Sequence, residues 1–479
     1  MGRHPAARAF FMLLFLAATG CMRLGPDYER PKTGIDIPEA YKERKTRQTR
    51  SCLPQDLWWQ QFDDPRLNRV IADVLRSNQD IAKAAASVSE AAAVAGQTAA
   101  DQLPSLDLNA EASRQEQSFV SPMAGGYQSV RIDSFSLTLP ASYEVDLWGR
   151  LARATEAARA ELLAAEKNRQ AVVQSLVAEA AAQYFNIQYL QRQLSVTREL
   201  KNSYQENLEL IEARYRRGLA SVLELRQARR SLAQSESEIP PLKQSIGKAR
   251  HKLAVLQGKY PETGSLPSDP GTAFALPPAV PAGLPSELLN RRPDIRAAEA
   301  SLQAACAKIG AAKASRFPQI TLTGSFGYTS EELDLLFEPR NQLWRIATGI
   351  VQPVFDAGKR KAAQRAAEAR YEKQLAAYAK TVLDAFAEVE GALLTREQQI
   401  DRYKRLQDYL TEAQKTLGTA LARYRRGVTD YLNVLDAQQA KYQAELSLLD
   451  TQYAIYANRV SLYRALGGGW GSREALANQ

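Results

Sequence analysis

Two long stretches of the chain place alanine and leucine at helical spacing among charged residues and contain no proline. They cover residues 150–216 and 359–425, which are 67 residues each. At a rise of about 1.5 Å per residue, each stretch predicts a helix of roughly 100 Å. A globular core does not need helices of this length, so we expect rods that pack along one another.

Four shorter stretches with helical spacing flank the long ones. A pair of them would total about the length of one long helix. Two short helices stacked end to end would therefore form a spliced rod, antiparallel to the continuous one. Alanine at many packing positions allows the rods to approach closely. The four stretches are residues 66–102, 221–257, 286–315 and 431–466.

Between the helices, apolar residues recur at every second position, which is typical of strands with one apolar and one polar face. Within residues 132–145, the alternate positions counted from Leu137 are mostly apolar, whereas the positions between them, such as Ser136, are mostly polar. Runs of this length match tilted membrane-spanning strands. The other predicted strands are 104–117, 318–330 and 343–355, the last placed mainly by the internal repeat, with Trp344, Ile346, Ile350 and Val354 facing outward.

The alternative is a small soluble sheet whose apolar face covers a core. The predicted helices are rods, however, and leave nothing obvious to cover such a sheet. Four strands cannot close a barrel, and an open sheet edge is not tolerated in lipid. Because side chains already fill the lumen of a barrel of about eight strands, three chains giving twelve strands form the smallest homo-oligomer with an aqueous channel.

The chain is an internal tandem duplication. Residues 213–219 (Ala-Arg-Tyr-Arg-Arg-Gly-Leu) return almost unchanged as residues 422–428, and the same offset relates Gly149 to Gly358. The period far exceeds the roughly 20–50 residues of solenoid repeats, so each copy is a half-domain of helix, two strands, long helix, turn and helix. We expect repeats over 66–257 and 286–466, a connector over 258–285 and a tail over 467–479.

The N-terminus has the layout of a secretory signal, with a basic start, an apolar run and then Thr19-Gly20-Cys21. Small residues before a cysteine resemble a lipoprotein cleavage site. We therefore expect a signal peptide over 1–20, diacylglycerol and palmitate attached covalently to Cys21, and an extended lipidated segment over 21–65. A signal peptide with a chance cysteine is the alternative. Met22, where an acidic residue would retain a lipoprotein in the inner membrane, points to the outer membrane.

Composition excludes several classes of function. The 479 residues carry a net charge of +9, with 62 Lys and Arg interleaved with 53 Asp and Glu, which reads as solvated helical faces and not as a nucleic-acid surface. After cleavage at Cys21 only one histidine, His251, would remain, which excludes multi-histidine metal sites and serine-histidine triads. Cys52 and Cys306 are too few for a disulfide framework, and nothing in the sequence says whether they pair.

Short motifs along the whole mature chain, in order, resemble one family. They are Gly25-Pro26-Asp27-Tyr28, Arg30-Pro31, Trp58-Trp59, Arg291-Arg292-Pro293-Asp294-Ile295, Phe317-Pro318, Gln352-Pro353-Val354-Phe355-Asp356-Ala357-Gly358 and Ala465-Leu466-Gly467-Gly468-Gly469-Trp470. The family is the lipoprotein branch of the TolC-like outer membrane factors.

The resemblance implies a mixed α and β membrane protein. Its fold would be a homotrimer with a twelve-stranded barrel in the outer membrane of a Gram-negative bacterium, continued by a twelve-helix coiled-coil tunnel in the periplasm. The connector would form an equatorial girdle. It also implies a passive exit duct, without cofactor or catalysis, for drugs and other small molecules. The partners would be outer membrane lipid, a periplasmic adaptor and an inner-membrane transporter of the RND type.

The resemblance also assigns site residues. Gly218 and Gly427 would be the periplasmic tips of two helical hairpins, with Leu219 and Val428 as apolar knobs for an adaptor. A helix C-cap without a partner is the alternative reading of each tip.

Four further residues match a periplasmic gate. Glu224 and Tyr424 correspond to positions that hold inner and outer coils together, and Asn433 and Asp436 correspond to acidic positions that line the closed pore. Asn433 replaces one of the acids, which puts a strong cation block in doubt. An ordinary surface carboxylate is the alternative for the acidic residues.

Two rival functions remain open from the sequence. A type I protein secretion duct would share the fold, although the lipoprotein signature favours small-solute efflux. A purely periplasmic coiled-coil scaffold would need no detergent and would conduct no ions. For an enzyme, the sequence offers no nucleophile-base pair, metal cluster or phosphate-binding loop.

Overall fold

The protein is described here from a computed structural model that covers residues 23–31, 41, 57–121, 126–261 and 285–468. The predicted signal peptide, Cys21, Cys52 and most of the predicted connector lie outside the described residues. The chain divides into two compact units. The first unit joins residues up to Thr33 to Val88–Ala165 and Ala298–Tyr378, and the second contains Gly34–Ser87, Glu166–Ala297 and Ala379–Gln479.

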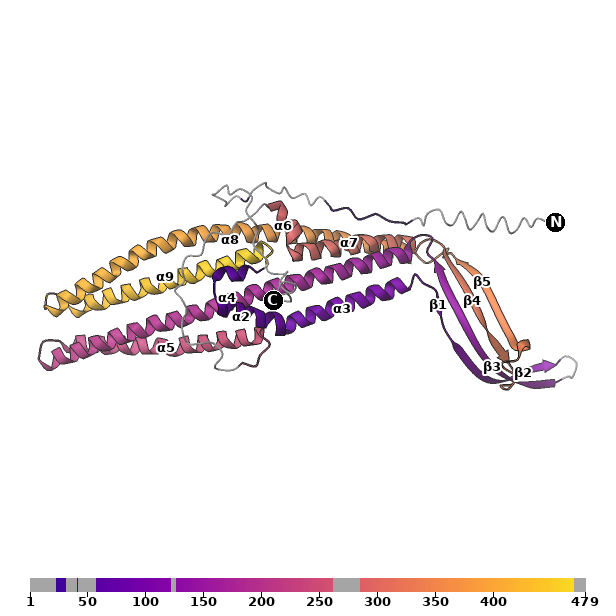
Figure 1. The fold of residues 1–479 in the computed structure, drawn as a ribbon, viewed down its shortest axis with the longest axis horizontal. Helices are drawn as coiled ribbons and strands as arrows, with labels where there is room; N and C mark the ends of the chain where they lie inside the picture. The colour runs from indigo at the N-terminus through magenta and orange to yellow at the C-terminus, as the bar shows by residue number, and fades with distance from the viewer. Residues whose placement is uncertain (1–22, 32–40, 42–56, 122–125, 262–284, 469–479) are drawn as a thin grey trace. The chain divides into compact units, whose positions relative to one another are not determined.

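The same order of elements appears twice along the chain (Figure 1). The first half contains η1 (Trp58–Phe62), α2 (Pro65–Ser77), α3 (Gln79–Ala100), β1 (Ser105–Leu106), β2 (Asn109–Ser121), β3 (Gly126–Val145), α4 (Arg150–Arg216) and α5 (Val222–Leu256). The second contains α6 (Pro285–Arg291), α7 (Pro293–Ala314), β4 (Gln319–Ser330), η2 (Pro339–Asn341), β5 (Gln342–Val351), α8 (Lys359–Arg425) and α9 (Tyr431–Ala465). The two predicted long helices are confirmed, at 67 residues each.

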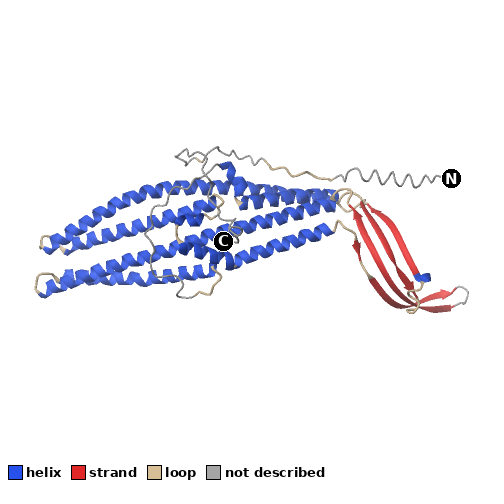
Figure 2. Cartoon of the chain, viewed as in Figure 1, coloured by secondary structure: helices blue, strands red, loops and turns tan. Residues whose placement is uncertain are grey.

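The strands of the first unit form one antiparallel sheet in the order β1-β3-β4-β5, with β2 paired beside β1 on the same edge of β3 (Figure 2). The predicted first strand is interrupted after Leu106. There Asp107 N–H donates to Pro140 O at 3.0 Å, but Pro140 has no N–H to return the second bond of that pair. Proline on the neighbouring strand thus explains why β1 and β2 are separate.

Cross-strand pairing confirms the predicted apolar face. Leu137 lies opposite Ala110 on one side and Tyr328 on the other. Directly opposed residues share a face, so the apolar positions of neighbouring strands are in register.

Three predicted strand ends are wrong. The β2–β3 hairpin is longer than expected, supported by the ion pair of Arg131 with Glu116 at 3.2 Å. In contrast, β5 ends at Val351 because Pro353 follows, and Val354 lies beyond the strand.

Each of the predicted short helices before the strands is broken in two, so the prediction of single helices over 66–102 and 286–315 is wrong. Asn78 ends α2 and begins α3, because its N–H donates to Val74 O at 3.0 Å and its Oδ1 accepts from Asp80 N–H at 2.8 Å. In the second half, Pro293 disfavours helical backbone at the preceding residue and opens α7.

The two breaks lie at equivalent positions of the duplication, and each fastens the end of a returning helix. Asn78 Nδ2 donates to the carbonyl of Leu256, the last residue of α5, at 2.8 Å. Arg292 Nη1 donates to the carbonyl of Ala465, the last residue of α9, at 3.3 Å. We call these contacts the first and second splice joints. Their acceptors are equivalent, whereas their donors are an amide and a guanidinium.

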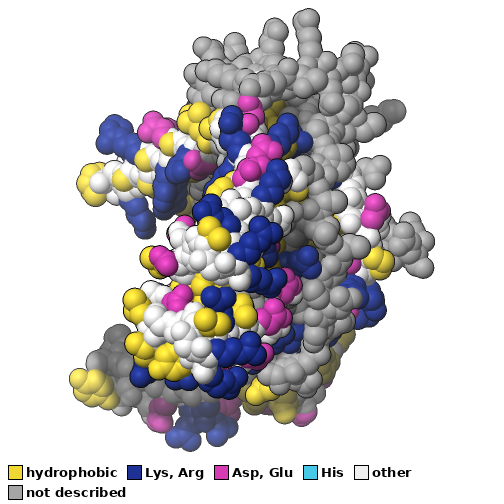
Figure 3. Space-filling model, turned by 90° about the vertical axis from the view of Figure 1, so that its left-hand side faces the viewer, with side chains coloured by type: hydrophobic (Ala, Val, Ile, Leu, Met, Phe, Trp, Pro, Cys, Tyr) yellow, Lys and Arg dark blue, Asp and Glu magenta, His cyan; other side chains and the backbone are white. Residues whose placement is uncertain are grey.

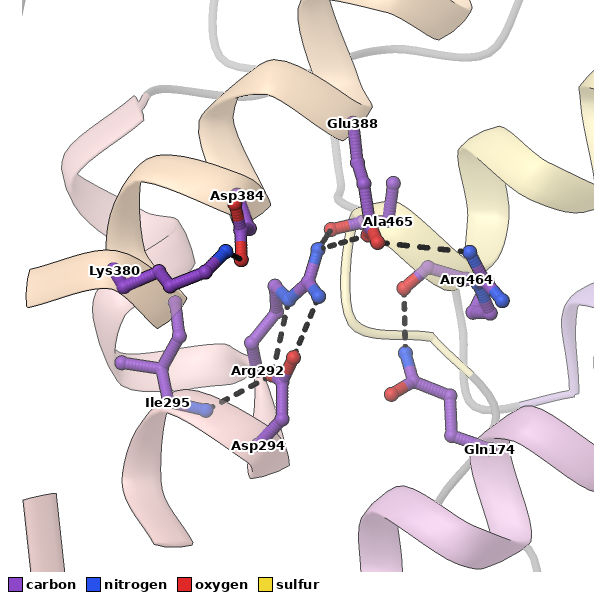
Figure 4. A network of polar contacts seen from close by, with 9 residues as sticks. All are labelled: Gln174, Arg292, Asp294, Ile295, Lys380, Asp384, Glu388, Arg464 and Ala465. Carbon is purple, nitrogen blue, oxygen red and sulfur yellow. Dashed lines mark hydrogen bonds and ion pairs between the residues drawn. The ribbon is translucent and has the colours of Figure 1, made fainter. Parts of the chain in front are cut away.

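The second splice joint is reinforced by carboxylates (Figure 4). Arg292 donates from Nε and Nη2 to the two oxygens of Asp294 at 3.0 and 2.6 Å, and from Nη1 to Glu388 Oε2 at 2.7 Å. Arg464 lies 3.7 Å from Glu388 on the exposed side. A buried guanidinium thus holds α7, α8 and the end of α9 together.

Residues 23–31, which we call the N-terminal strap, pack on α4 and α7 in the first unit. Leu24 N–H donates to Trp148 O at 3.2 Å, just before Gly149. Arg153 Nη2 pairs with Asp27 Oδ1 at 2.7 Å, and Arg30 Nη2 with Glu299 Oε2 at 2.6 Å. The strap is therefore tied to both helices by ion pairs.

Glycine at two positions allows this close approach. A Cβ on Gly25, whose φ is +101°, would overlap Gly310, and a Cβ on Gly310 would lie 2.8 Å from Leu24 O. Among the described residues, no helix is both long and apolar enough to cross a membrane.

Candidate functional site at the hairpin tips

Both hairpins of the second unit reverse through the same backbone motif. Gly218 and Gly427 have φ of +72° and +75°, a region that favours glycine. Leu219 N–H donates to Arg214 O at 2.9 Å, and Gly218 N–H donates to Tyr215 O at 2.9 Å. The second tip repeats both bonds. This pair of bonds is the Schellman motif, which satisfies the last carbonyls of the helix.

The residue after each glycine is apolar and exposed. Leu219 is 63% exposed and Val428 is 62% exposed. Other apolar side chains near the tips are also more than half exposed: Val222, Leu223 and Leu432. Arginines flank them in the sequence, and Figure 3 shows Lys and Arg side chains beside hydrophobic ones. The tips therefore offer apolar contact area framed by positive charge.

The tips differ at the start of the returning helix. Ser221 and Glu224 form a capping box, in which Ser221 N–H donates to Glu224 Oε2 at 2.7 Å and Glu224 N–H donates to Ser221 Oγ at 3.2 Å. Asp430, the N-cap of α9, makes no such side-chain bond. The Glu224 carboxylate thus has a local role that its position alone did not indicate.

Behind the tips, a buried cluster joins the two hairpins. It contains Tyr204, Leu208, Ile211, Leu225, Ala228, Tyr424, Tyr431, Val434 and Leu435. Tyr424 packs against Tyr431 with ring centroids 5.6 Å apart, and the Arg214 guanidinium lies 4.9 Å from the centre of the Tyr424 ring. Sequence reasoning assigned Tyr424 a polar role, but its ring is part of this core.

The hydroxyls of Tyr424 and Tyr431 are buried and make no hydrogen bond within the described part of the chain. Burial raises the pKa of the Tyr424 phenol, and the nearby Glu224 carboxylate raises it further. Burial also raises the pKa of Tyr431. Both phenols therefore stay neutral at physiological pH.

Asn433 and Asp436 lie one turn apart on α9, and both are exposed. Asn433 Nδ2 donates to Thr429 Oγ1 at 2.7 Å. Their neighbours Val434 and Leu435 are buried in the cluster. The pair thus projects from the hairpin core into solvent.

One polar contact behind the tips was not predicted. Gln438 on α9 is 3% exposed, donates from Nε2 to Ser203 Oγ at 2.6 Å and accepts from Asn207 Nδ2 at 2.9 Å. A glutamine at a position of the apolar stripe was the only sequence signal for it. This contact fixes the register of α9 against α4.

No group of His, Cys, Asp and Glu within the described ranges could hold a metal ion. Of the cysteines, Cys306 is described, and it is buried and free.

Comparisons with known proteins agree along nearly the whole chain. The profile of the outer membrane efflux protein family matches residues 70–259 and 284–468. The cation efflux system protein CusC of Escherichia coli O6:H1 is 36% identical over 460 residues, covering 95% of this chain and 97% of CusC. The pyoverdine export outer membrane protein OpmQ of Pseudomonas putida KT2440 is 36% identical over 452 residues, covering 92% of this chain and 93% of OpmQ.

Solved structures agree with the sequence relatives. The structure of the outer membrane channel OprN superposes with a TM-score of 0.87 and 31% identity, covering 94% of this chain and 99% of that one. This likeness confirms the predicted fold class, the outer membrane location and the efflux function. The chain therefore belongs to the outer membrane efflux protein family, the TolC-like exit ducts of efflux pumps.

Proposed function

We propose that this chain forms the outer membrane duct of a tripartite pump that exports small solutes, coupled through the hairpin tips to a periplasmic adaptor and an inner-membrane RND-type transporter. The observation that carries the proposal is the pair of matching tips, each with an exposed apolar residue after a glycine turn. An apolar knob framed by arginine suits a partner that offers an apolar socket with an acidic rim. The duct itself carries out no catalysis.

We propose a homotrimer as the working unit. The sheet of one chain keeps open edges at β5 and at β1 with β2, and three copies would pair these edges into a closed barrel. Diacylglycerol and palmitate on Cys21, which lies outside the described residues, would add an anchor in the periplasmic leaflet.

We assign the closed mouth of the duct to Tyr424, Asn433 and Asp436, with Glu224 beside them. The exposed Asp436 carboxylates of three chains would converge at the threefold axis and repel one another. The Tyr424 hydroxyl, buried near the Glu224 carboxylate without a well-aligned hydrogen bond, supports a polar contact at the mouth that assembly would complete. We expect Asp436→Ala combined with Tyr424→Phe to raise single-channel conductance in planar bilayers. Unchanged current would show that other residues build the constriction.

Small organic solutes are the proposed cargo. A soft-metal route uses thioether, thiolate and imidazole ligands, and this chain has only 4 methionines and 2 histidines in all. A complementation experiment distinguishes small-solute efflux from type I protein secretion. A strain without its own exit duct, carrying this chain, should regain efflux of a fluorescent dye and should not regain secretion of a polypeptide.

Leu219→Asp and Val428→Asp test the coupling. A carboxylate at an apolar contact must be desolvated without a partner, which opposes docking. Efflux and crosslinking to the adaptor should be lost, while the amount of trimer in the outer membrane stays normal. Leu219→Met keeps the apolar contact and should preserve efflux. Normal efflux by the aspartate variants would refute docking at the tips.

A further inference from the structure

The first unit contains a cavity of about 370 Å³ beside the N-terminal strap. Its lining residues come from the strap, the end of α3, the first turns of α4, and α7: Arg23, Gln102, Ala152, Thr155, Glu156, Arg159, Ala160, Leu163 and Gln303. One wall is thus apolar, formed by alanines and Leu163, and the remainder is polar. A cavity of this kind suits an amphipathic ligand.

Two cations of this lining have no ion-pair partner within the described ranges. Arg23 and Arg159 are exposed side chains, and neither approaches a described carboxylate within salt-bridge distance. The one acid of the lining, Glu156, is already paired with Arg153 at 2.9 Å. The cavity therefore presents unused positive charge, and guanidinium groups bind phosphate through two parallel hydrogen bonds.

The place of the cavity in the first unit indicates where its ligand comes from. Leu24, next to Arg23, is hydrogen-bonded to Trp148 at the point where β3 gives way to α4. Trp148 packs against Phe317 in a tilted arrangement, with ring centroids 5.0 Å apart. Aromatic pairs at the ends of membrane strands mark the level of the lipid headgroups. Arg23 therefore lies at the headgroup level.

Arg159 lies a few turns further along α4. Its Cα is nine residues after Arg150, the first residue of the helix, or about 14 Å along the axis at 1.5 Å per residue. Helical side chains lean toward the N-terminus of their helix, which brings the long Arg159 side chain back toward the strands. Both guanidinium groups can therefore meet one ligand that enters from the headgroup layer.

We propose that this cavity binds the phosphate of an anionic phospholipid of the periplasmic leaflet. Arg23 and Arg159 hold the phosphate, Gln102, Thr155 and Gln303 contact the polar headgroup, and the wall of Ala152, Ala160 and Leu163 receives the first part of an acyl chain. The lipid would fasten the strap to α3 and α4 at the membrane surface. This inference requires the outer membrane location and is independent of the adaptor and the cargo.

Titration of the detergent-extracted full channel tests the proposal. Short-chain phosphatidylglycerol should bind with one site per chain, measured by calorimetry and by native mass spectrometry, whereas short-chain phosphatidylcholine should bind at least tenfold more weakly. Arg23→Gln combined with Arg159→Gln should weaken phosphatidylglycerol binding by about tenfold or more, because charge-assisted bonds are lost. Arg402→Gln removes an exposed charge from the second unit and should leave binding unchanged.

Two results would overturn the proposal. Equal affinity for phosphatidylglycerol and phosphatidylcholine, or full binding by the double variant, would show that the arginines do not select a phosphate. Inorganic phosphate that competes at the same concentration as phosphatidylglycerol would show a free-anion site and exclude the lipid. Helical circular dichroism and trimer content of each variant confirm that the fold is intact.

Discussion

Replacing Gly25 with alanine should release the N-terminal strap from the helices. The residue has φ +101°, and a left-handed backbone costs an L-residue about 1–2 kcal/mol. The new Cβ would also overlap the backbone of Gly310, whose N lies 3.1 Å away, and both sides of this overlap are main chain. The strap must therefore move away, and each hydrogen bond that it loses costs about 1 kcal/mol. A total of roughly 2–4 kcal/mol corresponds to about a 30- to 1,000-fold increase in the detached population.

Trypsin measures this detachment. Arg23–Leu24 is a cleavable bond held beside Trp148 O, whereas Arg30 precedes proline and resists the enzyme. Cleavage tracks the open population when opening is fast relative to cutting, so the rate at Arg23 should rise in Gly25→Ala by a similar factor. Gly96→Ala is the matched control, because a Cβ there meets nothing within 4 Å and alanine favours the helix. Cleavage of Gly25→Ala at the wild-type rate would refute the reasoning.

Five further substitutions test the sheet and the splice joints. Leu137→Arg, on the apolar face, should reduce inserted trimer through a cost of about 2–4 kcal/mol at the bilayer midplane, whereas Ser136→Arg should mainly change conductance; equal trimer yields would contradict the assignment of faces. Asn78→Ala removes a helix cap and the bond to α5, so thermal unfolding should show a loss of about 1–2 kcal/mol, and an unchanged melting curve would argue against the first splice joint. Arg292→Ala removes a buried guanidinium and its bonds to Asp294, Glu388 and the Ala465 carbonyl, and should cost about 1–3 kcal/mol because both carboxylates stay partly solvated. Arg464→Ala, at the exposed edge, should cost under about 1 kcal/mol, and similar losses from the two would show that burial does not decide the effect.

The long elements were predictable because the signals for them are local and repeated. Residues 150–216 and 359–425 lack proline, and each is followed by a glycine turn, so both bounds are visible in the sequence. The apolar face of the sheet follows from the alternation of apolar and polar residues along each strand. A shift of one residue would move every side chain to the opposite face, so the face assignment is unambiguous. The internal repeat then supplied β5, whose own alternation is poor.

The breaks at Asn78 and Arg292 were not predictable from periodicity, because the apolar spacing continues through both. Asn78 caps α3 through local bonds, but its bond to a carbonyl of α5 depends on the tertiary fold and leaves no signal in the sequence. The break between β1 and β2 was also not predictable from local sequence, because its cause, Pro140, lies on the neighbouring strand.

At the hairpin tips, the sequence likewise predicted some features of the functional site and left others undetermined. The motif located Gly218, Gly427 and their apolar neighbours, and the structure exposes those neighbours. The family resemblance predicted that Glu224 and Tyr424 hold coils together by polar contacts; within one chain the buried Tyr424 hydroxyl lies near the Glu224 carboxylate without a well-aligned hydrogen bond. The gate assignment stays a prediction for the assembled duct, where a second chain can complete that contact.

The two splice joints have a consequence for the symmetry of the duct. Each joint anchors on a main-chain carbonyl, which no side-chain mutation can remove, but the donor is a neutral amide in one repeat and a guanidinium in the other. In a trimer, neutral and charged joints would alternate around one ring. A framework of six equivalent positions would thus carry its buried charge with only threefold symmetry.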